Sequence, residues 1–370
     1  MKRIVICADG TWNEPDQIDQ KTGKRKPSNV LKVARLVLGR GDDGTSQVVY
    51  YHEGVGTGPG LDKYTGGAFG DGMCANIRDL YRFVVHNYTP GDDLYFIGFS
   101  RGAFTVRTLA GFMNKFGLLH KGDDYYTSDI YKLYESNADQ DSDNWKRAFK
   151  YVESPHPCPP IKFIGVWDTV GSLGPPGWIG HAAKFVGQDK YKFHDISLNS
   201  NIQNAFHALA IDEHRQPFAP SIWTRPNGWN GTLEQVWFPG VHTNVGGGYD
   251  PDGVANEALQ WLIEKAEGLG LEFDAPVVAK YRPCFNSELR DSMTMMYRTL
   301  LGGEYPRPMG QHLQDGEAIH QAAMDRWNLL PDYRPANLDA CLRQVGNKLP
   351  VVQTMRIPRG APCPPLKPPQ

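Results

Sequence analysis

The sequence predicts an α/β fold in which a mostly parallel central sheet is flanked by helices. Short apolar runs end at or close to Gly, Asp or Pro, and they are nearly continuous, as in strands covered on both faces. Segments with apolar residues at helical spacing lie between several of these runs. Strands that alternate with helices in this way build parallel sheets.

The individual elements follow from these two patterns. The five predicted strands are Ile4–Ala8, Val48–His52, Leu94–Gly98, Ile161–Val166 and Gln235–Phe238. The predicted helices are Asn76–Tyr88, Ala103–Phe116 and Asn256–Ala266. Each helix has apolar residues on one face, which is the face expected to pack on the sheet.

Two long segments interrupt this alternation, Lys121–Pro160 and Gly171–Ser200. Segments of this length inside a compact domain usually form lids or binding walls. We therefore expect one domain over residues 1–350, with lid-like insertions near 121–160 and 171–200 at the mouth of the functional site. The Pro-rich stretch Arg356–Gln370 predicts a C-terminal tail over residues 351–370.

The composition is that of a globular protein, and it excludes several classes. The 370 residues are 40% hydrophobic and 22% charged, with a net charge of −2. A chain so close to neutrality lacks the basic surface of a nucleic-acid-binding protein. No run approaches the roughly 20 apolar residues of a transmembrane helix, and the six cysteines include no Cys-x-x-Cys pair that would indicate zinc.

The motif with the clearest chemical meaning is Gly98-Phe99-Ser100-Arg101-Gly102, which fits Gly-x-Ser-x-Gly. A predicted strand comes directly before it and a predicted helix directly after it. Strand, tight turn and helix form the setting of a nucleophile elbow, where flanking glycines allow a strained turn. We therefore expect Ser100 to be a nucleophile at the carboxyl end of the sheet.

A serine nucleophile needs a base, and the base needs an acid that orients it. Asp168 follows the strand Ile161–Val166, and His242 follows the last predicted strand, so both belong at the carboxyl end of the sheet. Ser100, Asp168 and His242 also follow the chain order of α/β-hydrolases. Rival candidates are His207, Asp212 and His214 in the stretch Phe206–Arg215, which we expect to be a helix lining the pocket. His320 is a further candidate for the pocket wall.

The oxyanion of an acyl-transfer reaction needs two well-aimed donors. The backbone N–H of Arg101, the residue after the nucleophile, is the first candidate. The second is expected in Asp9-Gly10-Thr11 at the end of the first strand, where Gly10 permits close approach of the backbone. Asp9 itself is a candidate pocket residue.

Six motifs together resemble the α/β-hydrolase domain of the class-one type VI secretion lipase effectors. They are Asp9-Gly-Thr-Trp-Asn13, Gly98-Phe-Ser-Arg-Gly-Ala103, Gly165-Val-Trp-Asp-Thr-Val170, His207-Ala-Leu-Ala-Ile-Asp-Glu-His-Arg215, Phe238-Pro-Gly-Val-His242 and Val245-Gly-Gly-Gly-Tyr249. The resemblance runs from Asp9 to about Arg326. It implies an α/β-hydrolase-like fold and phospholipase activity, with Ser100 as nucleophile, Asp168 as acid and His242 as base.

The chain departs from the family pattern at one position beside the base. Members of the family often have His-Ser-Asp before the glycine run, whereas this chain has His242-Thr243-Asn244. An amide replaces a carboxylate there, so a charge-based role does not carry over to Asn244.

These observations lead to a serine esterase or lipase of the phospholipase A type, which needs no cofactor and no metal. Its expected partner is an ester or phospholipid substrate, with peripheral rather than transmembrane contact to a membrane. The apolar run Ile4–Ala8 is too short for a signal peptide. We therefore expect a cytoplasmic protein, or one exported without a signal peptide by a contact-dependent secretion system.

Two alternatives remain open from the sequence. A metal-dependent hydrolase could use Asp9, Asp71, Asp168 and His242. A binding domain could keep the same fold without catalysis. An aspartyl phosphatase is disfavoured because Thr11 stands where a second aspartate is needed, and the glycines of 54–60 match neither nucleotide-binding pattern.

Overall fold

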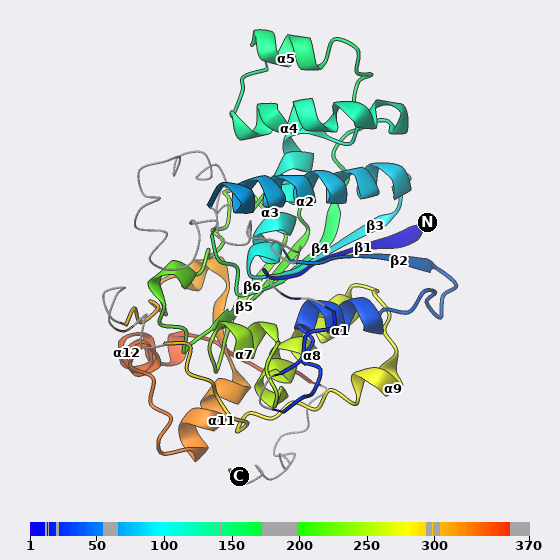
Figure 1. The fold of residues 1–370 in the computed structure, drawn as a ribbon. Helices are drawn as coiled ribbons and strands as arrows, with labels where there is room; N and C mark the ends of the chain where they lie inside the picture. The colour runs from blue at the N-terminus through cyan, green and yellow to red at the C-terminus, as the bar shows by residue number, and fades with distance from the viewer. Residues whose placement is uncertain are drawn as a thin grey trace.

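The computed structural model describes residues 1–54, 66–171, 198–293 and 304–355, apart from positions 12, 14, 20, 21 and 141, together with residue 298. Its centre is an eight-stranded sheet of order β2-β1-β3-β4-β5-β6-β7-β8, in which all neighbouring strands are parallel (Figure 1). The predicted α/β class, with a mostly parallel sheet flanked by helices, is confirmed. The strands are β1 (Lys2–Ala8), β2 (Ser46–His52), β3 (Asp93–Phe99), β4 (Ile161–Trp167), β5 (Asn204–Ala210), β6 (Thr232–Phe238), β7 (Glu317–His320) and β8 (Val351–Val352).

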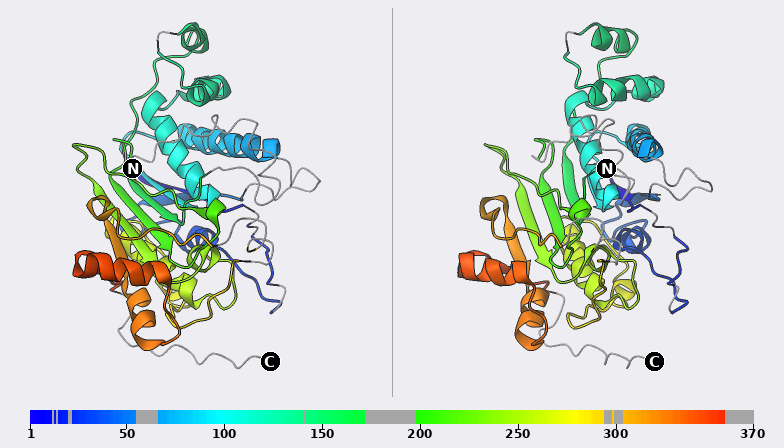
Figure 2. Two further views of the ribbon diagram at one scale, coloured as in Figure 1. Left: turned by 90° about the vertical axis from the view of Figure 1, so that its left-hand side faces the viewer. Right: turned by 60° about the vertical axis from the view of Figure 1, so that its left-hand side comes forward.

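Helices cover both faces of the sheet. On one face lie α2 (Gly66–Asn87) and α3 (Arg101–Phe116), and on the other lie α1 (Asn29–Leu36) and α8 (Gly253–Gly268) (Figures 1 and 2). Successive residues of a strand point to opposite faces. Accordingly, Ile4 and Ile6 of β1 join the core under α2 and α3, whereas Val5 and Cys7 join the core under α1 and α8.

The described chain has further helices and turns outside these four. They are α4 (Thr127–Glu135), α5 (Asp143–Ala148), α7 (His242–Gly246), α9 (Ala275–Val278), α11 (Gln321–Leu329) and α12 (Ala336–Val345), with 3₁₀ turns η2 (Lys121–Tyr126), η4 (Gln216–Phe218), η5 (Leu313–Asp315) and η6 (Gly346–Lys348). A third apolar cluster joins Trp237 of β6 and Ile319 of β7 to Leu338 of α12. The C-terminal part of the described chain is therefore built onto the sheet. Within the described ranges, none of the helices combines the length and apolar character that crossing a bilayer requires.

The stretch Phe206–Arg215 is not the helix that the sequence predicts. Residues Asn204–Ala210 form the central strand β5, paired with β4 and β6. The strand is almost wholly buried, because helices cover both faces of the sheet. A short run that is apolar on both sides has no alternation to distinguish it from a buried helix, and this ambiguity is why the prediction is wrong.

The segment Lys121–Pro160 does not wall the site around Ser100. It forms η2, α4 and α5, which lie beyond α2 and α3 as seen from the sheet (Figures 1 and 2). The ring of Phe116, at the end of α3, stacks on Trp145 at 4.9 Å. The helix α3 begins beside Ser100 and runs back along the sheet. The segment that follows its last turn therefore packs at the end of α3 that is remote from Ser100. Tyr131, Trp145 and Phe149 of this segment thus pack on α3.

Two other expectations concern the insertions and the tail. Most of Gly171–Ser200 lies outside the described residues, as does Arg356–Gln370. Val351–Val352, which composition assigns to the tail, instead forms β8 and pairs with β7. A two-residue strand at a sheet edge is too short to leave a period in the sequence.

Candidate functional site

The turn between β3 and α3 carries Ser100 in a strained backbone conformation. Its φ is 56° and its ψ is −120°, a region that non-glycine residues rarely adopt. A Cβ at Gly98 would lie 2.6 Å from Cα of Ala103, and one at Gly102 would lie 2.1 Å from the carbonyl oxygen of Ala8. Only glycine fits at these two positions, so the strand, tight turn and helix expected around Ser100 are present.

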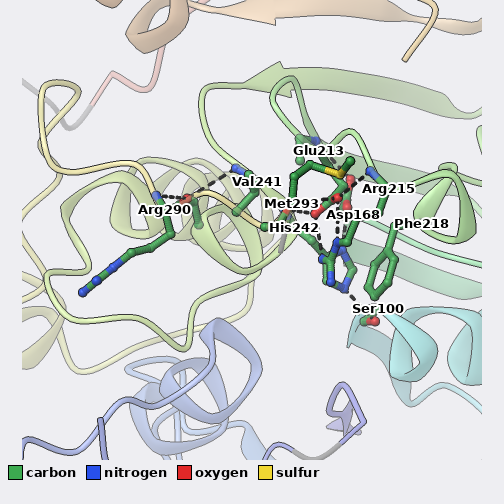
Figure 3. Close-up of polar contacts among 12 residues, drawn as sticks. Ser100, Asp168, Glu213, Arg215, Phe218, Val241, His242, Arg290 and Met293 are labelled. Atoms are coloured by element: carbon green, nitrogen blue, oxygen red, sulfur yellow. Dashed lines mark hydrogen bonds and ion pairs between the residues drawn. The ribbon is translucent and has the colours of Figure 1, made fainter. Parts of the chain in front are cut away.

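Ser100, His242 and Asp168 form one chain of hydrogen bonds (Figure 3). Nε2 of His242 lies 2.8 Å from Oγ of Ser100, and Nδ1 of His242 lies 2.6 Å from Oδ2 of Asp168. Since Asp168 accepts the Nδ1 proton, Nε2 is left to accept the proton of the serine hydroxyl. The three residues follow β3, β6 and β4, whose carboxyl ends meet at one edge of the sheet.

The carboxylate of Asp168 also pairs with Arg307, a residue that the sequence does not single out. The two side chains are fully buried, with Nη1 of Arg307 2.6 Å from Oδ1 and Nη2 3.0 Å from Oδ2 of Asp168. The local sequence Pro306-Arg307-Pro308 matches no catalytic pattern. It therefore carries no signal from which this contact could be found.

These contacts decide the charges of the site. Burial by itself would raise the pKa of Asp168, but the charges of Arg307 and His242 hold that pKa well below its ordinary value. Burial lowers the pKa of His242 below its ordinary value, although the hydrogen bond to Asp168 acts in the opposite direction. At neutral pH the pair consists of a carboxylate and a neutral imidazole, which is the form that can accept a proton.

Asp9, at the end of β1, organises the loop beside Ser100. Its buried carboxylate accepts four hydrogen bonds, from Gly10 N at 2.7 Å, Tyr51 Oη at 2.8 Å, Asn13 Nδ2 at 3.1 Å and Ser28 Oγ. Burial raises the pKa of Asp9 to about 6, although these hydrogen bonds act in the opposite direction. Ser28 also caps α1, so the loop is tied to a helix end.

The predicted oxyanion donors lie at this loop and at the start of α3. A Cβ at Gly10 would be 3.2 Å from Cβ of Ser100, so the loop touches the nucleophile. The N–H of Gly10, however, already donates to Asp9. Oγ1 of Thr11 is buried and has no hydrogen-bond partner among the described residues. Arg101 begins α3 directly after Ser100. Of the two loop residues, Thr11 is thus better placed than Gly10 to supply a donor.

A wall of three further residues supports His242, and none of the three is a predicted site residue. The ring of Phe218 lies 5.0 Å from the His242 ring, and the Arg215 guanidinium lies 3.6 Å above Phe218 (Figure 3). Glu213 is fully buried and accepts hydrogen bonds from the Arg215 side chain at 2.8 Å and from His242 N at 3.3 Å. Its place beside Asp212 in a recognised motif is the only sequence signal for it.

His207 and Asp212 support the site from behind and do not contact Ser100. Nε2 of the buried His207 accepts the N–H of Thr169, which follows Asp168, at 3.0 Å, and burial lowers the pKa of His207 to about 3. Oδ2 of Asp212 accepts the N–H of Gly240, two residues before His242, at 2.5 Å. Both residues hold the loops that present Asp168 and His242.

His320 is not part of the site. It ends β7, where its ring stacks on Phe238 and its Nε2 lies 3.0 Å from Oγ1 of Thr354. Burial lowers the pKa of His320 to about 3, so it is a neutral core histidine. His214 lies 3.5 Å from Glu304 in an ion-pair geometry rather than at Ser100.

Asn244, which stands where family members often have aspartate, has a structural use here. Its Oδ1 accepts the N–H groups of Val241 and Arg290 at 3.3 and 3.1 Å. An amide oxygen serves for both bonds, so the site needs no charge at this position. Within the part of the chain that is described, no three His, Cys, Asp or Glu side chains are arranged to hold a metal ion. The Asp71 side chain and residues 55–60 lie outside that part.

The chain is similar in sequence to a curated protein. An uncharacterized protein of Saccharomyces cerevisiae is 27% identical over an alignment of 244 residues, and the match covers 60% of this chain and 33% of that protein. The chain thus spans about a third of the length of this curated relative.

Two solved structures are more distant. One is an uncharacterized protein from Pseudomonas aeruginosa, with 17% identity, a TM-score of 0.44, and coverage of 76% of this chain and 49% of that one. The other is the Tle1 effector bound to the VgrG spike of the type VI secretion system, with 14% identity, a TM-score of 0.46, and coverage of 84% and 81%.

The family comparison is decisive. The family model of the catalytic domain of Tle1-like type VI secretion phospholipase effectors matches residues 2–265, which include Ser100, Asp168 and His242. By this match the chain belongs to the family of Tle1-like phospholipase effectors of the type VI secretion system.

Proposed function

We propose that this protein is a serine hydrolase that cleaves carboxylic esters of lipids, in the manner of a phospholipase A. The observation that carries the proposal is the unbroken chain of hydrogen bonds from Ser100 through His242 to Asp168. Membership of a phospholipase effector family supports the substrate class.

In the proposed reaction Oγ of Ser100 attacks the ester carbonyl while Nε2 of His242 takes its proton. Asp168 holds the imidazole in the required tautomer and stabilises the imidazolium that forms. The backbone N–H groups of Arg101 and Thr11 would bind the oxyanion, and the hydroxyl of Thr11 is a further candidate donor to it. His242 then returns the proton to the leaving alcohol, and water hydrolyses the acyl-enzyme by the same steps.

Two alternatives are weaker on chemical grounds. In a metal hydrolase the carboxylates would have to bind a metal ion, whereas Asp168 already pairs with the guanidinium of Arg307 and Asp9 accepts four hydrogen bonds. A catalytically silent binding domain would have no need to keep Ser100 at a strained φ of 56°. Loss of activity on chelation by EDTA, restored by a divalent ion, would favour the metal hydrolase.

The expected substrate is a phospholipid or a related acyl ester, which the protein would reach by peripheral contact with a membrane surface. Family membership supports export by a contact-dependent secretion system. Without a spanning segment in the described residues, we expect faster turnover of dispersed or micellar esters than of intact vesicles.

The proposal is tested with a fluorophosphonate probe and a series of p-nitrophenyl esters. The probe should label Ser100 in the wild type. The control variant is Ser142→Ala, which changes a serine at the remote N-cap of α5, and it should be labelled to the same extent as the wild type. If acyl chains are buried, kcat/KM should rise by up to about fourfold per methylene, and micellar phospholipid should be cleaved. A steady fall from acetate onward without phospholipid cleavage would replace the lipase with a small-ester hydrolase. Label on another serine would refute Ser100 as the nucleophile.

A further inference from the structure

Arg307 is a buried cation, and the site uses both terminal nitrogens of its guanidinium. Nη1 donates to Oδ1 of Asp168 at 2.6 Å and to the carbonyl oxygen of Ala210 at 2.9 Å. Nη2 donates to Oδ2 of Asp168 at 3.0 Å and to the carbonyl oxygen of Phe218 at 2.5 Å. One side chain thus joins the end of β4, the end of β5 and the wall beside His242.

The carboxylate of Asp168 is held at both oxygens. Oδ1 accepts from Arg307 and from the N–H of Ala210 at 3.0 Å, and Oδ2 accepts from Arg307 and from His242. A bidentate guanidinium lies in the plane of the carboxylate that it binds. The plane of Asp168, and with it the direction in which Oδ2 meets Nδ1 of His242, is therefore set by Arg307.

The loop that carries Arg307 is held on both sides. Pro306 and Pro308 flank it and restrict its backbone. The N–H of Tyr305 donates to the carbonyl oxygen of His214 at 2.8 Å, and the N–H of Gly310 donates to Oε1 of Glu317 at 2.7 Å. The match to the family model ends at residue 265, so this part of the site comes from outside the matched region.

We infer that Arg307 is a positioning residue of the proposed hydrolytic site, which holds the Asp168 carboxylate in the plane that His242 needs and offsets its negative charge. The inference rests on the proposed function for its catalytic meaning. Its geometric basis is the four donated hydrogen bonds, all made by a guanidinium with no exposed surface.

A charge consequence follows from this arrangement. Among the described residues, the charged groups that face His242 are Asp168 at Nδ1 and the Glu213–Arg215 pair beside its backbone and the Phe218 ring. Because Glu213 and Arg215 pair with each other, Arg307 is the cation that balances Asp168. Removing it must raise the affinity of the Asp168–His242 pair for a proton, wherever in the pair that proton resides.

The test compares Arg307→Met, which removes the charge at similar volume, with Arg307→Lys, which keeps the charge but loses the bidentate geometry. Arg326→Met is the matched control, because Arg326 is also buried but donates to the carbonyl oxygens of Phe285 and Ser287. Two readouts are used. One is kcat/KM for a p-nitrophenyl ester against pH, and the other is the titration of the His242 ring by NMR of ¹⁵N-histidine protein, assigned with His242→Gln.

In Arg307→Met we expect the titration of the Asp168–His242 pair to move up by about one pH unit, a tenfold change in proton affinity, with kcat at the plateau about a hundredfold lower. Arg307→Lys should lower kcat while its titration stays near that of the wild type. Arg326→Met should lower the unfolding midpoint in urea and leave the titration unchanged.

An unmoved titration in folded Arg307→Met would overturn the inference. If that variant does not fold, Arg307→Lys decides: unchanged kcat, or a titration that moves although the charge is kept, would refute it. The NMR readout needs no turnover, so it is read even if the wild type hydrolyses no ester. In that case the proposed function fails while the relationship between Arg307 and His242 stands or falls separately.

Discussion

Ser100 and Asp168 directly follow neighbouring strands, and both have a positive φ that is rare for non-glycine residues, 56° and 40°. The two turns are joined directly, because the N–H of Ser100 donates to the carbonyl oxygen of Trp167, the residue before Asp168, at 3.0 Å. Each such conformation costs on the order of 1–3 kcal/mol for a non-glycine residue. The parallel pairing of β3 with β4 supports that strain and presents both side chains at one edge.

Replacement of the proposed nucleophile should separate activity from stability. Ser100→Ala should lower kcat for p-nitrophenyl esters by about three orders of magnitude or more, because members of a triad act as a unit. The Ser100 side chain makes no capping bond to α3, so the urea midpoint should change little. Esterase assays and urea unfolding of the same preparation measure both effects. Substantial activity in a folded Ser100→Ala would exclude the proposed mechanism.

The pH profile should show its acidic limb below the ordinary histidine range. His242 must be neutral to accept a proton, and the neutral fraction rises with pH through its pKa. Since burial lowers the pKa of His242, the pH at which kcat/KM reaches half of its maximum should lie below about 6.5. Rates measured between pH 4.5 and 8 with one ester locate the limb. A limb well above pH 7 would contradict the geometry around His242.

Gly102, two residues after the nucleophile, should not tolerate replacement. A Cβ at Gly102 would lie 2.1 Å from the carbonyl oxygen of Ala8, which is backbone and cannot move aside. Gly102→Ala should therefore lower the free energy of unfolding by about 3 kcal/mol or more, or prevent folding. Gly122→Ala is the control, because a Cβ there would meet nothing within 4 Å. Equal urea midpoints for the two variants would contradict the close approach of α3 to β1.

The carboxylate of Asp9 should matter for both loop stability and rate. Asp9→Asn exchanges one acceptor oxygen for an N–H₂ group that faces donors, so at least one buried donor loses its acceptor. We expect a loss of about 1–3 kcal/mol in unfolding free energy, with a lower kcat as the loop carrying Thr11 relaxes.

Asp92→Asn is the matched control for this change. Asp92 is a buried carboxylate that binds Lys2 and Thr89 just before β3, at the opposite end of that strand from Ser100. The Asp92→Asn variant should have a lower free energy of unfolding than the wild type and the same kcat. A kcat for Asp9→Asn equal to that of the wild type would show that the loop does not contribute to the oxyanion site.

The expectations that failed share one cause, which is that a sequence pattern reports local burial and not direction in space. The run within Asn204–Ala210 is buried on both faces, and such a run is equally compatible with a helix and a central strand. The aromatic residues of Lys121–Pro160 predict apolar packing, and Tyr131 and Trp145 do pack, but on Phe112 and Phe116 of α3 instead of at Ser100. Gly10 fits a close approach to Ser100, yet its N–H is taken by Asp9.

By itself the sequence determined the alternation of buried strands and helices, the glycine-flanked turn at Ser100, and the strand ends at which Asp168 and His242 stand. These features are encoded locally, because apolar runs, turn residues and chain order are properties of a few neighbouring residues. The tertiary structure alone decided that Arg307 binds Asp168 across 139 positions, that Glu213 supports His242, and that β7 and β8 complete the sheet. Such contacts depend on how distant segments pack, and a guanidinium is buried only where the fold supplies oxygen acceptors to receive it.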